Sequence, residues 1–157
     1  MGNIPVADVS MEAHPVPAKV ATRLPCEPAS VTEARQVLEP LEPAVDEETI
    51  RTLKLLVTEL VSNSVRHSAS ASHEEIELSV AASPESVRVE VADSGPGFEP
   101  RPREQGQDED SGWGLHLVDH LSDRWGTERR GRMAVWFELD VDRTRAARAR
   151  RPAAAVA

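Results

Sequence analysis

Hydrophobic residues recur along this chain with two spacings, one typical of helices and the other of strands. Between residues 46 and 67 they return every three or four positions, and this period predicts a long amphipathic helix. The apolar face of that helix comprises Ile50, Leu53, Leu56, Val57, Leu60, Val61 and Ser64. A face this broad has to be buried, so we expect the helix to pack on a sheet.

Alternation of apolar and polar residues predicts strands in other parts of the chain. Residues 74–82 and 86–95 alternate clearly, and the turn between them contains Pro84, a residue that favours turns. Residues 20–25 suit a single short strand, and residues 124–141 suit two strands joined by a short turn. We therefore expect most neighbouring strands to form hairpins.

Capping residues indicate where two of the helices begin. Ser30 is expected to cap a short helix with Glu33 as its capping-box partner, and that helix runs to about Leu38 because Pro40 stops it. Asp46 is expected to open the long helix, since a carboxylate at this position accepts hydrogen bonds from the first free backbone N–H groups.

Residues 112–123 are predicted to form a glycine turn that enters a third helix. The order strand, helix, helix, strand, strand, loop, helix, strand, strand indicates the α+β class. We expect a two-layer α/β sandwich, in which a mixed, mostly antiparallel sheet carries its helices on one face. The folded domain is predicted to span residues 19–141, between disordered tails at residues 1–18 and at the Arg/Ala-rich residues 142–157.

Composition narrows the class of protein. The chain has 157 residues, a formal net charge of −9 and 3% aromatic residues, which argues against a nucleic-acid surface, an anionic-membrane surface and aromatic stacking platforms. Cys26 is the only cysteine, so no internal disulfide is possible. No apolar run approaches the roughly 20 residues that span a bilayer, and the N-terminus lacks an export signal. We expect a soluble, cytoplasmic protein of one domain.

A polar row borders the apolar face of the long helix. Glu59, Asn63 and His67 follow one another at steps of four residues, so they lie along one side of the helix. Such a row can be ordinary half-solvated helix surface. It can also be a cation and phosphate site, because amide and carboxylate oxygens suit Mg²⁺ and a carboxylate one turn away can take a proton.

Two glycine motifs add candidate chemistry. Asp93, Gly95 and Gly97 form D-x-G-x-G just after a strand; an ionised Asp accepts hydrogen bonds only, so it suits the amino group of adenine. Gly112 and Gly114 precede a helix whose free N–H groups can meet a phosphate. Taken separately, the first motif can be an ordinary turn and the second a simple helix start.

The three motifs together resemble a known superfamily. E-x-x-x-N on a helix, D-x-G-x-G after a strand, a variable loop and G-x-G-L opening a helix are similar to the N, G1 and G2 boxes of the GHKL ATPase/kinase superfamily. The segments "ELVSNSVRHS", "GWGLHLVDHLSDRWG" and "VWFEL" look most like its small branch, the anti-sigma-factor serine kinases of actinobacterial type. The resemblance covers roughly residues 20–140 and implies the Bergerat ATP-binding fold.

The resemblance also implies roles for particular residues. Glu59 would act as general base, Asn63 would ligate Mg²⁺, and residues 99–111 would form the ATP lid. Asp93 would read the adenine amine, Gly95 and Gly97 would shape the base pocket, and the glycines before the third helix would meet the phosphates. The residues implied to hold the nucleotide are Asn63, Asp93, Gly95, Gly97, Gly112, Gly114 and Leu115.

The implied cofactors are ATP and Mg²⁺, and the implied activity is phosphorylation of a small anti-anti-sigma (STAS-type) partner by a protein that also binds a sigma factor. A homodimer is possible by the same resemblance; direct binding of nucleic acid or membrane is not expected. One alternative is a non-catalytic nucleotide-binding module that sequesters a transcription regulator, and another is a stand-alone ATPase. The carboxylate Glu59 favours an enzyme, whereas the acidic side chains of the lid favour a binding module; these are Glu104, Asp108, Glu109 and Asp110.

Overall fold

The computed structural model describes residues 19–67, 74–93 and 113–141. The predicted lid at 99–111, both predicted tails, Gly95, Gly97 and Gly112 lie outside these ranges. The elements, in chain order, are β1 (Lys19–Pro25), α1 (Ser30–Gln36), the 3₁₀ turn η1 (Glu39–Leu41), α2 (Glu47–His67), β2 (Glu75–Ala82), β3 (Ser86–Asp93), α3 (Trp113–Leu121), β4 (Arg124–Arg130) and β5 (Arg132–Asp140). This is the order of strands and long helices that the hydrophobic pattern predicts.

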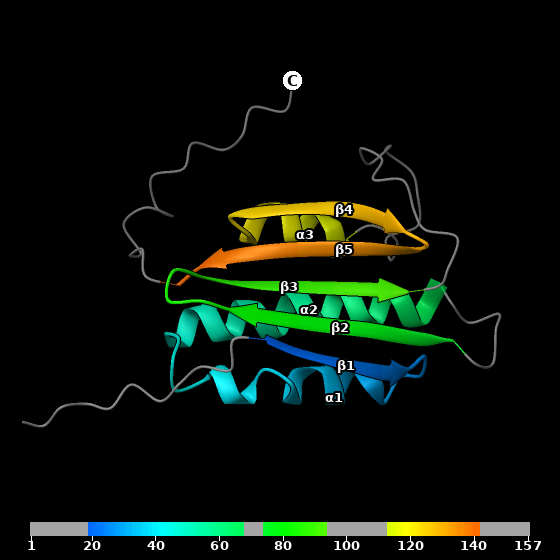
Figure 1. Cartoon of the computed structure of the whole chain (residues 1–157), viewed down its shortest axis with the longest axis horizontal. Coiled ribbons are helices and arrows are strands. Elements are labelled where there is room, and N and C mark those ends of the chain that lie inside the picture. The colour runs from blue at the N-terminus through cyan, green and yellow to red at the C-terminus, as the bar shows by residue number, and fades with distance from the viewer. Residues whose placement is uncertain (1–18, 68–73, 94–112, 142–157) are drawn as a thin grey trace, which may run out of the picture.

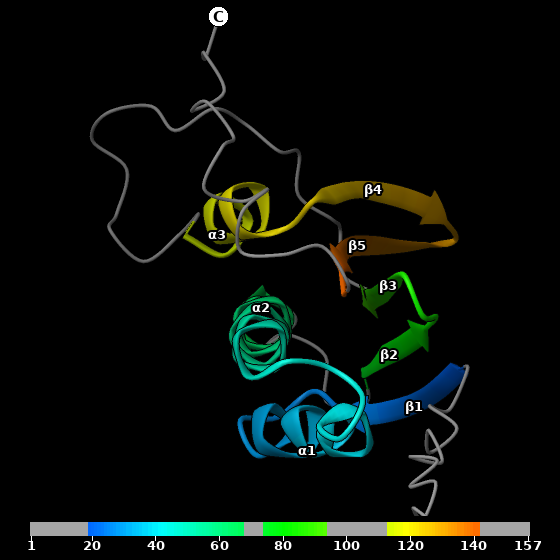
Figure 2. The same ribbon diagram turned by 90° about the vertical axis from the view of Figure 1, so that its left-hand side faces the viewer.

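The five strands form one sheet in the order β1-β2-β3-β5-β4. All four pairings are antiparallel, so the expectation of a mostly antiparallel sheet is confirmed and its mixed character is not seen among these strands. β4 lies at the edge and β5 returns between β3 and β4, which keeps β3 and β4 parallel without pairing them. Helices α1, α2 and α3 all cover the same face of the sheet (Figure 1, Figure 2). The α+β sandwich predicted from the sequence is therefore confirmed.

The core lies between this face and α2. Every residue of the predicted apolar face of α2 is buried, and it meets inward side chains of the central strands, among which Val89 and Phe137 are register partners. Burying each such aliphatic or aromatic side chain contributes roughly 1.5–3 kcal/mol. Because α2 is held along its whole length, the polar row at its edge is fixed relative to the sheet.

The predicted start of the long helix α2 is confirmed, whereas the predicted N-cap of α1 is wrong. Asp46 accepts hydrogen bonds from the backbone N–H of Thr49 (2.9 Å) and from its hydroxyl (2.6 Å), and the hydroxyl bond is the first cause that lowers the pKa of Asp46. At α1 the prediction was wrong, because the N-cap residue is Ala29 and no side chain caps the helix. Ser30 is buried and donates instead to the carbonyl oxygen of Pro25 at 2.5 Å, since a buried hydroxyl needs a partner.

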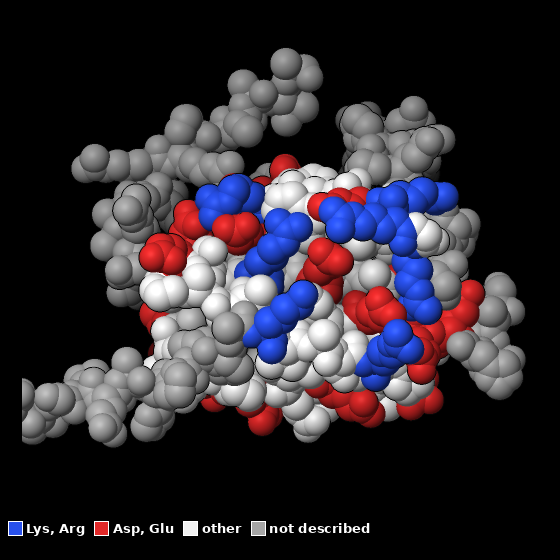
Figure 3. All heavy atoms as spheres, viewed as in Figure 1, with Lys and Arg blue, Asp and Glu red and all other residues white. Residues whose placement is uncertain are grey.

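The opposite face of the sheet is turned to the viewer in Figure 3 and carries rows of arginine and glutamate. Toward the β4 edge of this face Trp136 covers Gly126, where an added Cβ would come within 2.9 Å of the indole ring. The guanidinium carbon of Arg88 stands 3.8 Å from the centre of that ring, in a cation–π contact. A shallow hollow of about 320 Å³ lies on this face beside Ala21 and Ser79. It is separated by the sheet from the helix layer and so from the polar row of α2.

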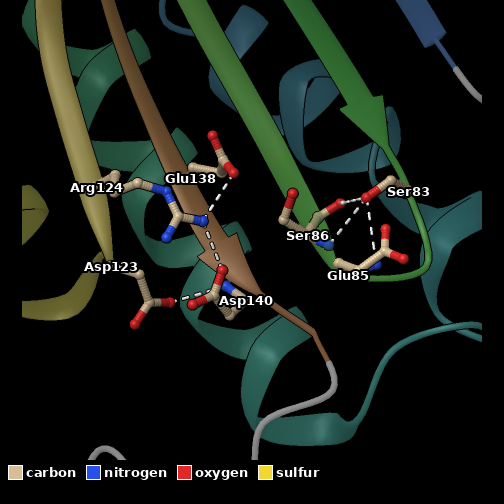
Figure 4. Close-up of polar contacts among 7 residues, drawn as sticks. All are labelled: Ser83, Glu85, Ser86, Asp123, Arg124, Glu138 and Asp140. Atoms are coloured by element: carbon tan, nitrogen blue, oxygen red, sulfur yellow. Dashed lines mark hydrogen bonds and ion pairs between the residues drawn. The ribbon is translucent and has the colours of Figure 1, made fainter.

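One end of the sheet is closed by a polar network (Figure 4). The Arg124 guanidinium donates to Glu138 (2.8 Å) and to Asp140 (2.6 Å), and the backbone N–H of Asp140 donates to the Asp123 carboxylate (2.8 Å). The bond from Arg124 is the first cause that lowers the pKa of Glu138. This network joins the start of β4 to the end of β5 and leaves the other end of the sheet for the candidate site.

No helix in residues 19–67, 74–93 or 113–141 is both long and apolar enough to span a membrane.

Candidate functional site

The polar row on α2 lies where its spacing predicts. Glu59 and Asn63 are half-buried and His67, the last residue of the helix, is exposed. The Asn63 amide oxygen accepts a hydrogen bond from the Arg66 guanidinium at 3.2 Å. This contact lies on the surface, where a guanidinium can exchange its partner for water or for a ligand at small cost. Two oxygen-bearing side chains are thus held one helical turn apart beside the core.

A hydrogen bond connects this helix to the end of β3. The Ser64 hydroxyl donates to Asp93 Oδ2 at 2.7 Å, across 29 positions of sequence. Ser64 is 5% exposed, and hydrogen bonds from a hydroxyl to a carboxylate are stronger than those between neutral groups. The bond orients the Asp93 carboxylate and places it beside the residue that follows Asn63. Two motifs that are separate in the sequence therefore share one site.

The sequence indicates that Ser64 needs a hydrogen-bond partner, although we assigned the residue only to the apolar face. A serine on a core-facing row is a buried hydroxyl, and buried polar groups in folded proteins are almost always hydrogen-bonded. Cys26, the residue that follows β1, also lies beside Ser64: its thiol is 3.7 Å from the Ser64 carbonyl oxygen. Cys26 is half-buried rather than fully buried, and it packs against the core.

The third element of the site is α3. It ends at Leu121, just before β4 begins at Arg124, and β4 begins opposite Glu138, at the closed end of the sheet. The N-terminus of α3 therefore points toward the other end, where β3 stops at Asp93 (Figure 1). Gly114 is the second residue of α3, and Leu115 is half-buried against the core. A helix N-terminus presents free N–H groups and a positive dipole end, which favour anions.

The structure thus brings the end of β3, the second half of α2 and the N-terminal end of α3 to the same end of the sheet. Glu59, Asn63, Asp93 and Leu115 lie in or beside this region, while Gly95, Gly97 and Gly112 fall outside the described ranges. The oxygen donors fit a hard cation such as Mg²⁺, which prefers carboxylate and amide oxygens and keeps several waters. Within the described ranges no three His, Cys, Asp or Glu side chains gather as a metal site.

One comparison with known proteins identifies a family. The family model of the histidine kinase-like ATPase domain matches residues 24–138. That range contains every element from the end of β1 to most of β5, together with all three motifs. No curated protein matches the chain.

Proposed function

The chain belongs to the histidine kinase-like ATPase domain family, and from that premise we propose that it binds ATP with Mg²⁺ at the end of the sheet where Ser64 meets Asp93. We further propose that it is an anti-sigma factor with protein-serine kinase activity toward an anti-anti-sigma (STAS-type) partner. The observation that carries the proposal is the 2.7 Å bond from Ser64 to Asp93. It joins the helix that bears Glu59 and Asn63 to the carboxylate that suits adenine.

Nucleotide recognition follows from the properties of these groups. Asp93, oriented by Ser64, would accept a hydrogen bond from the adenine amino group, which guanine lacks at that position. The N-terminus of α3 would face the phosphates. Asn63 would hold Mg²⁺ through its amide oxygen, and the bound ion would supply positive charge to the phosphates.

Glu59 would serve the transfer itself. One turn before Asn63, its carboxylate would take the proton of a serine hydroxyl on the partner protein. The bond between the γ-phosphorus and the ADP oxygen breaks, and a bond from that phosphorus to the serine oxygen forms. In such reactions the protein acts mainly through positioning and electrostatics. A half-buried carboxylate beside the core is well placed for this role, because helix packing limits its motion.

The test is a pair of measurements on the wild type and on Glu59→Ala: ATP affinity by calorimetry, and transfer of γ-labelled phosphate to candidate partner proteins and to water. We expect the variant to bind ATP as tightly as the wild type or slightly more tightly, because it loses a negative charge near phosphate. Transfer should fall by at least ~100-fold, the lower end of what a general base contributes.

Glu48→Ala is the matched control, since it removes an exposed carboxylate from the first turn of the same helix and should change neither quantity. If the wild type binds ATP but transfers phosphate neither to a partner nor to water, the kinase proposal fails and a binding module that sequesters a regulator stands. Hydrolysis without transfer to any partner would identify a stand-alone ATPase. Normal transfer by Glu59→Ala would exclude Glu59 as the base.

A further inference from the structure

Two histidines stand side by side on the outer surface of α3. His116 and His120 are one turn apart, and both are exposed. Their ring centres are 4.0 Å apart and the ring planes are inclined by 41°. Residues at i and i+4 project from the same side of a helix, and two histidines at this spacing are a known way to hold one metal ion.

The hydrogen bond made by Nδ1 of His120 sets the tautomer in which Nε2 can bind a metal. Its Nδ1 lies 2.9 Å from the backbone carbonyl oxygen of His116. A carbonyl only accepts, so Nδ1 carries the proton of the neutral ring and Nε2 keeps its lone pair. Metal-ligating histidines almost always donate their other N–H in this way, often to a backbone carbonyl, because the bond fixes both the tautomer and the ring orientation.

The neighbouring carboxylate adds negative charge to the same surface. Asp119 Oδ2 lies 4.0 Å from Nδ1 of His120, and Oδ1 of the same carboxylate accepts from the indole N–H of Trp125 at 2.8 Å. Asp119 is therefore held toward β4, beside the histidines. Its negative charge attracts a cation, and the contact with Trp125 places a fluorescent side chain near the pair.

We propose that His116 and His120 together chelate one divalent transition-metal ion, of the class of Ni²⁺ or Zn²⁺, on the surface of α3. Imidazole nitrogen suits these ions, whereas Mg²⁺ prefers oxygen, so this site is chemically distinct from the proposed nucleotide site. The described residues hold no cluster of three or more possible ligands, and water completes the coordination. Two protein ligands imply reversible binding, much weaker than that of a structural zinc site.

The experiment is a calorimetric titration of the full chain, without an affinity tag, with Ni²⁺ in the presence of excess Mg²⁺ and no nucleotide. We expect one saturable site per chain and a rise of the thermal midpoint with Ni²⁺ concentration, because a ligand of the native state stabilises it. His116→Gln and His120→Gln should each weaken binding by at least about tenfold, since either change removes one arm of the chelate.

His67→Gln is the control, because it removes an exposed histidine from another helix and should leave Ni²⁺ affinity unchanged. Circular dichroism of each variant checks that the fold is retained. The proposal is overturned if the wild type shows no saturable Ni²⁺ binding, or if both α3 variants bind Ni²⁺ as tightly as the wild type. Neither result bears on ATP binding, which is measured separately.

Discussion

A serine hydroxyl and carboxylate side chains lie near each end of β3, but they make different contacts at the two ends. At its start, the Ser83 hydroxyl accepts from the backbone N–H groups of Glu85 (3.2 Å) and Ser86 (3.1 Å) and so closes the turn that precedes the strand. Beside that turn, the Arg124 guanidinium pairs with two carboxylates of β5 (Figure 4). At the other end, the Ser64 hydroxyl reaches from a different element to the Asp93 carboxylate.

The difference separates a structural carboxylate from one suited to recognition. One arginine pairs with both Glu138 and Asp140 and stabilises the closed end of the sheet. At the other end, the donor to Asp93 is a neutral hydroxyl, which orients the carboxylate. Changes at the Asp93 end should therefore alter nucleotide binding more than stability, and changes at the closed end should do the reverse.

The largest effect on binding is expected from Asp93→Asn. An amide has one acceptor atom where the carboxylate has two and lacks its charge, and a hydrogen bond to a charged group is worth roughly 1.5–3 kcal/mol. ATP affinity should fall by about 10- to 100-fold, and most of the ATP-induced rise in thermal midpoint should disappear. Asp140→Asn, at the closed end, is the control and should keep that rise. If ATP raises the thermal midpoint of Asp93→Asn as much as that of Asp140→Asn, Asp93 does not bind the adenine.

Asn63→Ala tests the metal part of the site. The change should remove the dependence of nucleotide affinity on Mg²⁺, because the amide oxygen proposed as its ligand is gone, while the fold remains intact. Affinity is measured by calorimetry with and without Mg²⁺. Arg66→Ala removes the observed partner of the amide and keeps the amide itself, so it should retain the Mg²⁺ effect. If Mg²⁺ strengthens binding to Asn63→Ala by the same factor as in the wild type, another group holds the cation.

Ser64→Ala tests whether orientation of the carboxylate matters. A hydrogen bond to a charged group is worth roughly 1.5–3 kcal/mol, but Ser64 acts on the nucleotide only through Asp93, so only part of that loss reaches the affinity. ATP affinity should fall by roughly three- to tenfold, less than in Asp93→Asn. The double variant should be hardly weaker than Asp93→Asn alone, because both changes remove the same interaction. Ser62→Ala, on the same helix, is the matched control. Fully additive effects of Ser64→Ala and Asp93→Asn on affinity would contradict the proposed orienting role.

The smallest effect is expected from Arg124→Ala, at the closed end. Half-exposed ion pairs are worth about 0.2–1 kcal/mol, so the free energy of unfolding should fall by about that much at neutral pH, with no change in ATP affinity. Because the pKa of Glu138 is lowered from its ordinary 4.5, the pair's contribution is fully present above that value and is lost as pH falls through the lowered pKa. Denaturant unfolding at several pH values should show the two proteins converging below pH 4.5. A constant difference down to low pH would exclude this ion pair as its source.

Much of the fold follows from local pattern. The apolar stripe of α2 and the alternation of β2 and β3 have periods that a few neighbouring residues establish, and all of these elements form within a residue or two of the predicted bounds. The start of α2 was also predicted correctly, because Asp46 and Thr49 are three residues apart and need no partner from elsewhere. The start of α1 was not, because Ser30 had a competing acceptor in the preceding strand.

The sequence by itself determined the two-layer class, the face of α2 that is buried and the positions of the motifs that identify the family, because each depends on residues close together in the chain. The tertiary structure alone decided that β5 lies between β3 and β4, that Gly126 lies beneath Trp136 and that Ser64 bonds to Asp93. Each of these depends on which distant segments become neighbours. A hydroxyl has many acceptable partners, and only the packing of α2 against the sheet determines which of them is within reach.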